Sequence, residues 1–104
     1  MKSTGTIVLL AGLLVGPAAV AQNVEAGGQF AQRSCMQCHA IEGPAPPIGS
    51  LAPPPFSAVA NMLSATEMSL RAFLQTPHAK MPNLMLAPED AGNVIAFILS
   101  LRQG

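Results

Sequence analysis

Two cysteines and a histidine are the residues of this 104-residue chain best suited to chemistry, and they lie together in the sequence Cys35-Met36-Gln37-Cys38-His39. Two thiols three positions apart, followed directly by an imidazole, match the covalent attachment site of c-type haem. Each thiol can add across one haem vinyl group, because both cysteines lie on consecutive turns of local helix that face the same porphyrin edge. His39 is then placed beneath the iron as an axial ligand. The spacing therefore predicts one covalently bound haem c.

Other uses of a Cys-x-x-Cys pair fit this chain less well. A dithiol redox motif belongs at a strand-to-helix junction of an alternating βαβ pattern, which the sequence lacks. A zinc site needs a second pair of ligands that is also missing. Six methionines suggest a periplasmic copper carrier with soft Met, His and Cys ligands. That alternative is weak, because the methionines are scattered and the adjacency of Cys38 and His39 stays unexplained.

The N-terminal segment predicts export. Lys2 gives a positive start, residues 7–15 are an apolar run too short to span a bilayer, and Ala19-Val20-Ala21 has the small-residue pattern of a cleavage site. We expect cleavage after Ala21, which makes residues 1–21 a signal peptide and residues 22–104 a single domain in the periplasm. No later segment is apolar over a length that spans a membrane, so we expect no transmembrane segment in the mature chain.

Composition predicts that the cofactor serves as part of the core. The chain has no Trp or Tyr and only four Phe, and a domain of this size buries relatively little surface. With both cysteines in thioether bonds, no disulfide is available. We therefore expect the haem-free chain to be largely unfolded. Residues 22–104 carry four Lys or Arg against five Asp or Glu, which excludes a basic nucleic-acid-binding surface and strong electrostatic steering.

Turn residues and apolar spacing predict an all-α domain. We expect helices over about 26–34, 56–63, 66–75 and 88–101, and a proline-rich loop over residues 43–55. No strand pattern competes. The buried stripe expected for the last helix, with Phe97 alongside, consists of Ala91, Val94, Ile95, Ile98 and Leu101.

Helix ends carry their own signals. Ser64-Ala65-Thr66-Glu67 reads as a capping box in which Ser64 caps the third helix and Pro77 stops it. Pro88 suits the first turn of the last helix, and Arg102 is expected to complement the negative end of the same helix.

A six-coordinate iron needs a second axial ligand. Met81 is the first candidate, because Lys80-Met81-Pro82 lies in a non-helical segment between two helices and far enough beyond His39 for the chain to wrap the haem. Met85 on the same loop is the runner-up, and His78 is less favoured. Two other methionines fall at helical spacing and are expected to pack in the core: Met62 and Met68.

The proline-rich loop is expected to cover the haem. Proline lacks an N–H and offers a carbonyl of fixed geometry, which can accept a hydrogen bond from the second ring nitrogen of His39. With imidazole on one face and thioether on the other, the iron has no open site, and the chain is expected to transfer single electrons rather than to act as an enzyme.

At this point nearly all of residues 22–104 resembles the small bacterial class I monohaem cytochromes c. The segments that carry the resemblance are Gly27-x-x-Phe30-Ala31, Cys35-x-x-Cys38-His39, Ala52-Pro53-Pro54-Pro55-Phe56, Pro77-His78-x-x-Met81-Pro82 and residues 94–101. The resemblance implies about four helices wrapped around one haem. It also implies that the first and last helices cross, with Gly27 permitting close approach and Phe97 as the packed aromatic.

The resemblance implies a monomeric periplasmic carrier that shuttles electrons between larger redox proteins. Aligning Pro-Pro-Phe favours Pro54 over Pro53 as the carbonyl that contacts His39. Ala87 stands where many relatives have a capping Thr or Ser, a loss of about 1 kcal/mol. Without a Trp, the partners of the haem propionates are open, and Arg71 and Lys80 are candidates. A haem c protein with an open iron site, serving as an enzyme subunit or gas sensor, remains the alternative.

Overall fold

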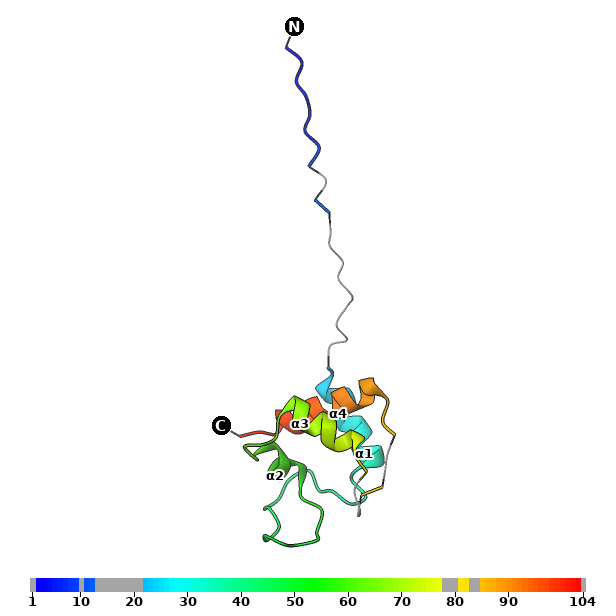
Figure 1. Cartoon of the computed structure of the whole chain (residues 1–104), viewed down its shortest axis with the longest axis vertical. Coiled ribbons are helices and arrows are strands. Elements are labelled where there is room, and N and C mark those ends of the chain that lie inside the picture. The colour runs from blue at the N-terminus through cyan, green and yellow to red at the C-terminus, as the bar shows by residue number, and fades with distance from the viewer. Residues whose placement is uncertain (1, 10, 13–21, 78–80, 83–84, 104) are drawn as a thin grey trace.

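The computed structural model describes residues 2–9, 11–12, 22–77, 81–82 and 85–103, and over these ranges it contains helices and no strand (Figure 1). The helices are α1 (Val24–Ser34), α2 (Phe56–Ala60), α3 (Glu67–Gln75) and α4 (Pro88–Ser100). α4 contacts each of the other three. The all-α prediction is confirmed, although α1 begins two residues earlier than expected and α2 is shorter.

The crossing of α1 and α4 organises the fold (Figure 1). A methyl group at Gly27 would overlap the backbone carbonyl of Asn93, so only glycine lets the two helices approach this closely. Asn23 begins α1 by accepting the N–H of Ala26 on its side-chain oxygen at 3.0 Å. The Asn23 backbone N–H then donates to Asn93 Oδ1 at 2.8 Å, which fixes the start of α1 against α4. The predicted crossing is confirmed.

The protein core is small and rich in alanine. Of the predicted α4 stripe, Ala91, Val94, Ile95 and Ile98 are buried, whereas Leu101 is half-buried. Only Val94 and Ile95 are large side chains that are fully enclosed in the described ranges. In the part of the chain that the structure describes, nine hydrophobic residues are buried: Ala31, Phe56, Ala60, Ala65, Leu70, Ala91, Val94, Ile95 and Ile98.

The cap of α3 is Thr66, and the prediction that Ser64 plays this role was wrong. Thr66 Oγ1 accepts the N–H of Ser69 at 3.0 Å, and Ser69 Oγ accepts the N–H of Thr66 at 2.9 Å. Because α3 begins only at Glu67, the residue immediately before it is the one whose hydroxyl reaches the third helical N–H. Glu67 is thereby left to pair with Arg71 one turn later, at 2.8 Å.

Arg102 was expected to complement the negative end of α4, and the hydrogen bonds of its guanidinium go to carbonyls outside that helix. Nε donates to the carbonyl of Ala60, the last residue of α2, at 2.8 Å, and Nη2 donates to the carbonyls of Met62 and Ala65. A guanidinium has several donors in a planar fork, so it can satisfy the carbonyls left open where a short helix ends. Arg102 therefore ties the C-terminal segment to the connection between α2 and α3.

The N-terminal segment forms no helix over residues 2–9, and each of these residues is exposed. The predicted cleavage sequence Ala19-Val20-Ala21 lies outside the described residues. Among the helices in the described ranges, none has the length and apolar character needed to cross a membrane.

Candidate functional site

The two cysteines lie in a tight turn that continues α1. Cys35 N–H donates to Ala31 O at 2.8 Å as the helix ends, and the N–H groups of Cys38 and His39 then return to Cys35 O at 3.2 and 3.0 Å. The turn keeps the backbone of the two cysteines and His39 close together. Both thiols are free; Cys38 is exposed and Cys35 half-buried. Burial raises the pKa of the Cys35 thiol, because desolvation disfavours the thiolate.

His39 is held by a backbone carbonyl of the proline-rich loop. Its Nδ1 lies 2.8 Å from the carbonyl oxygen of Pro54. A carbonyl can only accept, so Nδ1 is the donor in this contact, and in a neutral imidazole the lone pair is then on Nε2. A neutral imidazole with Nδ1 bonded to the backbone and Nε2 free is the form that ligates a metal. Of the two prolines weighed from the sequence, Pro54 rather than Pro53 makes this contact.

Backbone hydrogen bonds explain why Pro54 is in position. The N–H groups of Phe56 and Ser57, at the start of α2, donate to the carbonyls of Ala40 and Ile41 at 2.9 and 2.8 Å. These bonds draw the start of α2 against the segment that follows His39, and they close the proline-rich loop. The Pro54 carbonyl is thus fixed from both sides of the loop.

Phe56 is a site residue that the sequence reasoning missed. Its ring stacks on His39 with centroids 5.2 Å apart and an interplanar angle of 24°. The Phe56 ring also packs edge to face against the Phe97 ring of α4, with centroids 6.3 Å apart and an interplanar angle of 79°. The aromatic side chains therefore connect the imidazole to the crossing of α1 and α4. The sequence signal for this role was that Phe56, one of four phenylalanines, directly follows three prolines. We used that pattern only to align the loop.

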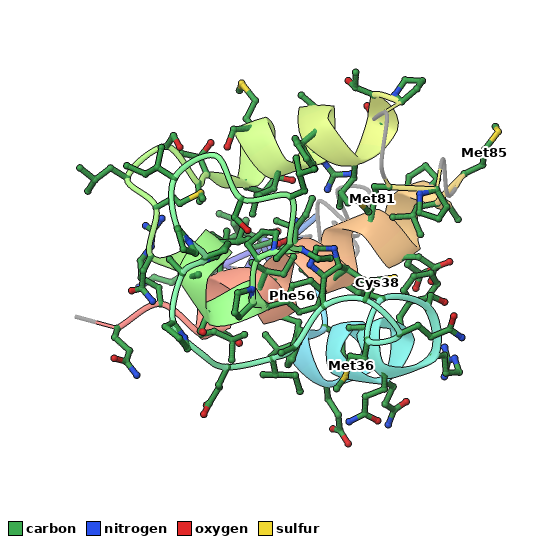
Figure 2. All side chains as sticks on the ribbon, turned by 90° about the horizontal axis from the view of Figure 1, so that it is seen from below. Met36, Cys38, Phe56, Met81 and Met85 are labelled. Atoms are coloured by element: carbon green, nitrogen blue, oxygen red, sulfur yellow. The ribbon has the colours of Figure 1, made fainter. Side chains whose placement is uncertain are left out.

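The methionines fall into two groups. Met81 is half-buried, whereas Met85 is 92% exposed and points away from the body of the protein (Figure 2). Met62 and Met68 are 48% and 79% exposed, so the prediction that they pack in the core was wrong. Met62 lies beyond the end of α2 at Ala60, and Met68 lies on an exposed side of α3, so neither belongs to the buried core.

Three other residues were candidates from the sequence. His78 and Lys80 lie outside the described residues. Arg71, suggested as a propionate partner, donates Nε and Nη2 to Glu67 Oε1, both at 2.8 Å. Its charge is largely satisfied by this pair along one helix face.

The side chains present fit a covalently attached haem. Two free thiols lie within four positions of an imidazole whose Nδ1 is occupied and whose Nε2 is available. The thioether of Met81 lies on the segment between α3 and α4 with its side chain partly buried. The alanine-rich core leaves apolar surface for a flat macrocycle to cover. An imidazole nitrogen and a thioether sulfur are donors of the kinds that serve as axial ligands of haem.

Comparisons with known proteins agree with this chemistry. The family model described as cytochrome c matches residues 24–102. Cytochrome c-552 of Bradyrhizobium diazoefficiens is 34% identical over 99 residues, a match that covers 94% of this chain and 93% of that protein. No solved structure matches the chain significantly.

Proposed function

Because this chain belongs to the cytochrome c family and carries haem c on Cys35 and Cys38, we propose that it is a periplasmic one-electron carrier with His39 and Met81 as axial ligands. The observation that carries the proposal is the 2.8 Å contact between His39 Nδ1 and the Pro54 carbonyl. That contact commits one ring nitrogen to the backbone and directs the other towards a metal.

His39 is built to hold one orientation. The carbonyl of Pro54 limits rotation of the ring, and the Phe56 ring limits its tilt. A hydrogen bond to Nδ1 also increases the electron donation from Nε2. An imidazole restrained in this way needs little rearrangement between oxidation states, which suits rapid electron exchange.

Met81 is the methionine whose surroundings best suit iron ligation. It is half-buried, whereas Met85 is exposed to solvent on the same connection (Figure 2). Haem c supplies one-electron iron chemistry when bound, and an uncharged sulfur ligand favours its ferrous form. With His39 on the other face, Met81 leaves no coordination site for a substrate.

The proposed docking surface is apolar, and Arg102 lies beside it with its guanidinium bonded to the carbonyls of Met62 and Ala65. No charged residue occurs between Glu42 and Glu67, and five large apolar side chains in or beside this segment are exposed: Ile48, Leu51, Met62, Leu63 and Met68. Ile48 lies at the tip of a turn in which Ser50 N–H donates to Pro47 O at 2.9 Å. We propose that larger redox proteins, as electron donor and acceptor, dock on this surface through brief contacts with small buried area.

We also propose that the chain is exported and that residues 1–21 are removed by cleavage after Ala21. The helical domain starts at Val24, only a few residues after the proposed cleavage position, so removal of residues 1–21 leaves α1 and its cap intact. Residues 22–104 then form the mature, monomeric domain. The periplasm is a compartment in which secreted cysteine-containing proteins are common.

The ligand set can be tested by absorption spectroscopy of the ferric holoprotein. A weak long-wavelength charge-transfer band reports methionine sulfur on iron, and we expect it in the wild type and in Met85→Ala but not in Met81→Ala. Loss of the band in Met85→Ala, but not in Met81→Ala, would identify Met85 as the sulfur ligand. A wild type without the band, and with carbon monoxide binding in the ferrous form, would favour an open-site enzyme subunit or gas sensor.

A further inference from the structure

Gln22 is the residue that the proposed cleavage after Ala21 would leave at the N-terminus, and the inference rests on that cleavage. We propose that Gln22 is a modification site at which the mature chain cyclises to pyroglutamate. The α-amino nitrogen attacks the side-chain Cδ, so that an N–Cδ bond forms. The Cδ–Nε2 bond breaks, and the amide nitrogen leaves as ammonia with a proton from the amine. No oxidant or second substrate is required.

The structure around Gln22 can accept this lactam without loss of a hydrogen bond. Asn23 supplies both local anchors: its N–H donates to Asn93 Oδ1 at 2.8 Å, and its Oδ1 accepts from Ala26 N–H at 3.0 Å. Cyclisation changes the amine and side chain of Gln22 but not these groups. The cap of α1 and its attachment to α4 therefore stay intact in the cyclised protein.

The Gln22 side chain lies against the α4 backbone at Gly92, which has no side chain. A methyl group added at Gly92 would lie 3.6 Å from Gln22 Cγ and 3.8 Å from Gln22 Nε2. The absence of a side chain at Gly92 leaves room for a compact five-membered ring on that surface. Gln22 itself is exposed, so its amide is not locked into other packing before the ring closes.

Charge favours the cyclised form. A free α-ammonium on Gln22 would lie one residue before the cap of α1, at the positive end of the helix dipole, where a cation is unfavourable. The nearest charged side chain over Gly92 is also cationic, since Arg71 Nη2 lies 3.3 Å from the same added methyl position. Glu67 partly offsets this charge through its pair with Arg71. Ring closure removes the α-amino charge and leaves the helix start without a like charge.

The test uses the full chain, exported and haem-loaded, and measures the intact mass and N-terminal sequence of the purified holoprotein. We expect the mass of residues 22–104 with haem, less one ammonia molecule, and no release of residues by stepwise N-terminal degradation. After denaturation and treatment with pyroglutamyl peptidase, the first residue released should be Asn23. The matched control is Gln22→Asn, which keeps an amide but would need a four-membered ring, and should have a free amine.

Two results would overturn the inference in distinguishable ways. A mature chain that begins with an open Gln22, even after prolonged incubation at growth temperature, would refute cyclisation while cleavage after Ala21 stands. A first residue other than Gln22 would refute the cleavage position and the modification together. The absorption spectrum of the same sample reports ligation of the haem separately, so neither result is confused with failure of the electron-carrier proposal.

Discussion

The His39 imidazole stacks on the Phe56 ring at a centroid separation of 5.2 Å while its Nδ1 contacts the carbonyl of Pro54, two positions before Phe56. One short segment therefore restrains the imidazole in two directions. The same Phe56 ring meets Phe97 edge to face, so the orientation of the His39 imidazole is coupled to the crossing of α1 and α4. The packing of these helices therefore also affects how His39 is positioned.

Replacing Phe56 by Leu should weaken both stability and ligand orientation. Each aromatic pair contributes about 0.5–1.5 kcal/mol beyond its buried area, so losing two pairs should lower the free energy of unfolding of the holoprotein by about 1–3 kcal/mol. Denaturant unfolding measures this change. The ferric EPR spectrum, which responds to the orientation of the axial ligand plane, should change as well.

An unaltered EPR spectrum in Phe56→Leu would show that the Pro54 carbonyl alone orients the imidazole. A loss of stability with no spectral change would therefore confine Phe56 to a packing role.

Gly27→Ala should be strongly destabilising because the added methyl would overlap the carbonyl of Asn93. Overpacking of this kind costs about 1–3 kcal/mol, and here the obstacle is backbone rather than a flexible side chain. Gly92→Ala is the matched control on the partner helix, since its methyl would meet only side-chain atoms of Arg71 and Gln22. Alanine favours helix over glycine by about 0.5–1 kcal/mol, so this control should be neutral or stabilising.

Urea unfolding of the two holoproteins distinguishes them directly. Equal stabilities for Gly27→Ala and Gly92→Ala would mean that the helix crossing can open without cost, against the close approach seen here.

Thr66→Ala should lower the free energy of unfolding by about 1 kcal/mol, because it removes the hydroxyl that accepts the Ser69 N–H. Ser64→Ala, two residues earlier, should change stability by no more than about 0.5 kcal/mol, since Ser64 contributes its carbonyl rather than its hydroxyl to Ser69. Thermal unfolding measured by circular dichroism compares the pair. A larger loss of stability in Ser64→Ala than in Thr66→Ala would show that Ser64 caps α3, as expected from the sequence.

The elements could be predicted because their signals are local. Pro88 and the apolar stripe of α4 determine where that helix lies and which face is buried, and the Cys-x-x-Cys-His spacing identifies the attachment site without any tertiary information. The capping residue of α3 was misplaced because Ser64 and Thr66 are both good caps. Which one acts depends on the exact helix start, set by the connection to α2.

Tertiary partners were harder to predict. Arg102 was expected to interact with its own helix, but its guanidinium finds the open carbonyls at the end of α2, a contact between residues 42 positions apart. Met62 and Met68 have helical spacing, yet spacing does not say which face of a helix another element covers. The stack of His39 on Phe56 follows from closure of the proline-rich loop, which no local pattern reports.

Haem-free protein should have little helix. Four of the nine buried hydrophobic residues in the described ranges are alanines, so side chains alone bury little apolar area. Protein made without haem attachment should therefore give a weakly helical far-ultraviolet circular dichroism spectrum, whereas the holoprotein should be strongly helical. A haem-free chain with the full helical signal and a cooperative melt would show that the α1 and α4 crossing is stable by itself.

Electron transfer from the natural redox partner should depend weakly on ionic strength. The segment between Glu42 and Glu67 that contributes most of the proposed docking surface has no charged residue, and the adjacent Arg102 guanidinium is held by backbone carbonyls, so salt has few exposed charge pairs to screen. The rate of reduction by membranes from cells that naturally make the protein, followed across a range of salt concentrations, tests this. A steep salt dependence would place docking on a charged surface elsewhere.

The same assay tests where the partner binds. Ile48→Glu places a charge at the exposed turn tip of the docking surface and should slow second-order electron transfer at low protein concentration, because a carboxylate must then be desolvated on docking. Gln29→Glu adds the same charge on the exposed side of α1 and should have little effect. Equal electron-transfer rates for the two variants, with unchanged absorption spectra, would show that the partner does not dock on the surface around Ile48. A rate lost only in Ile48→Glu would locate docking there.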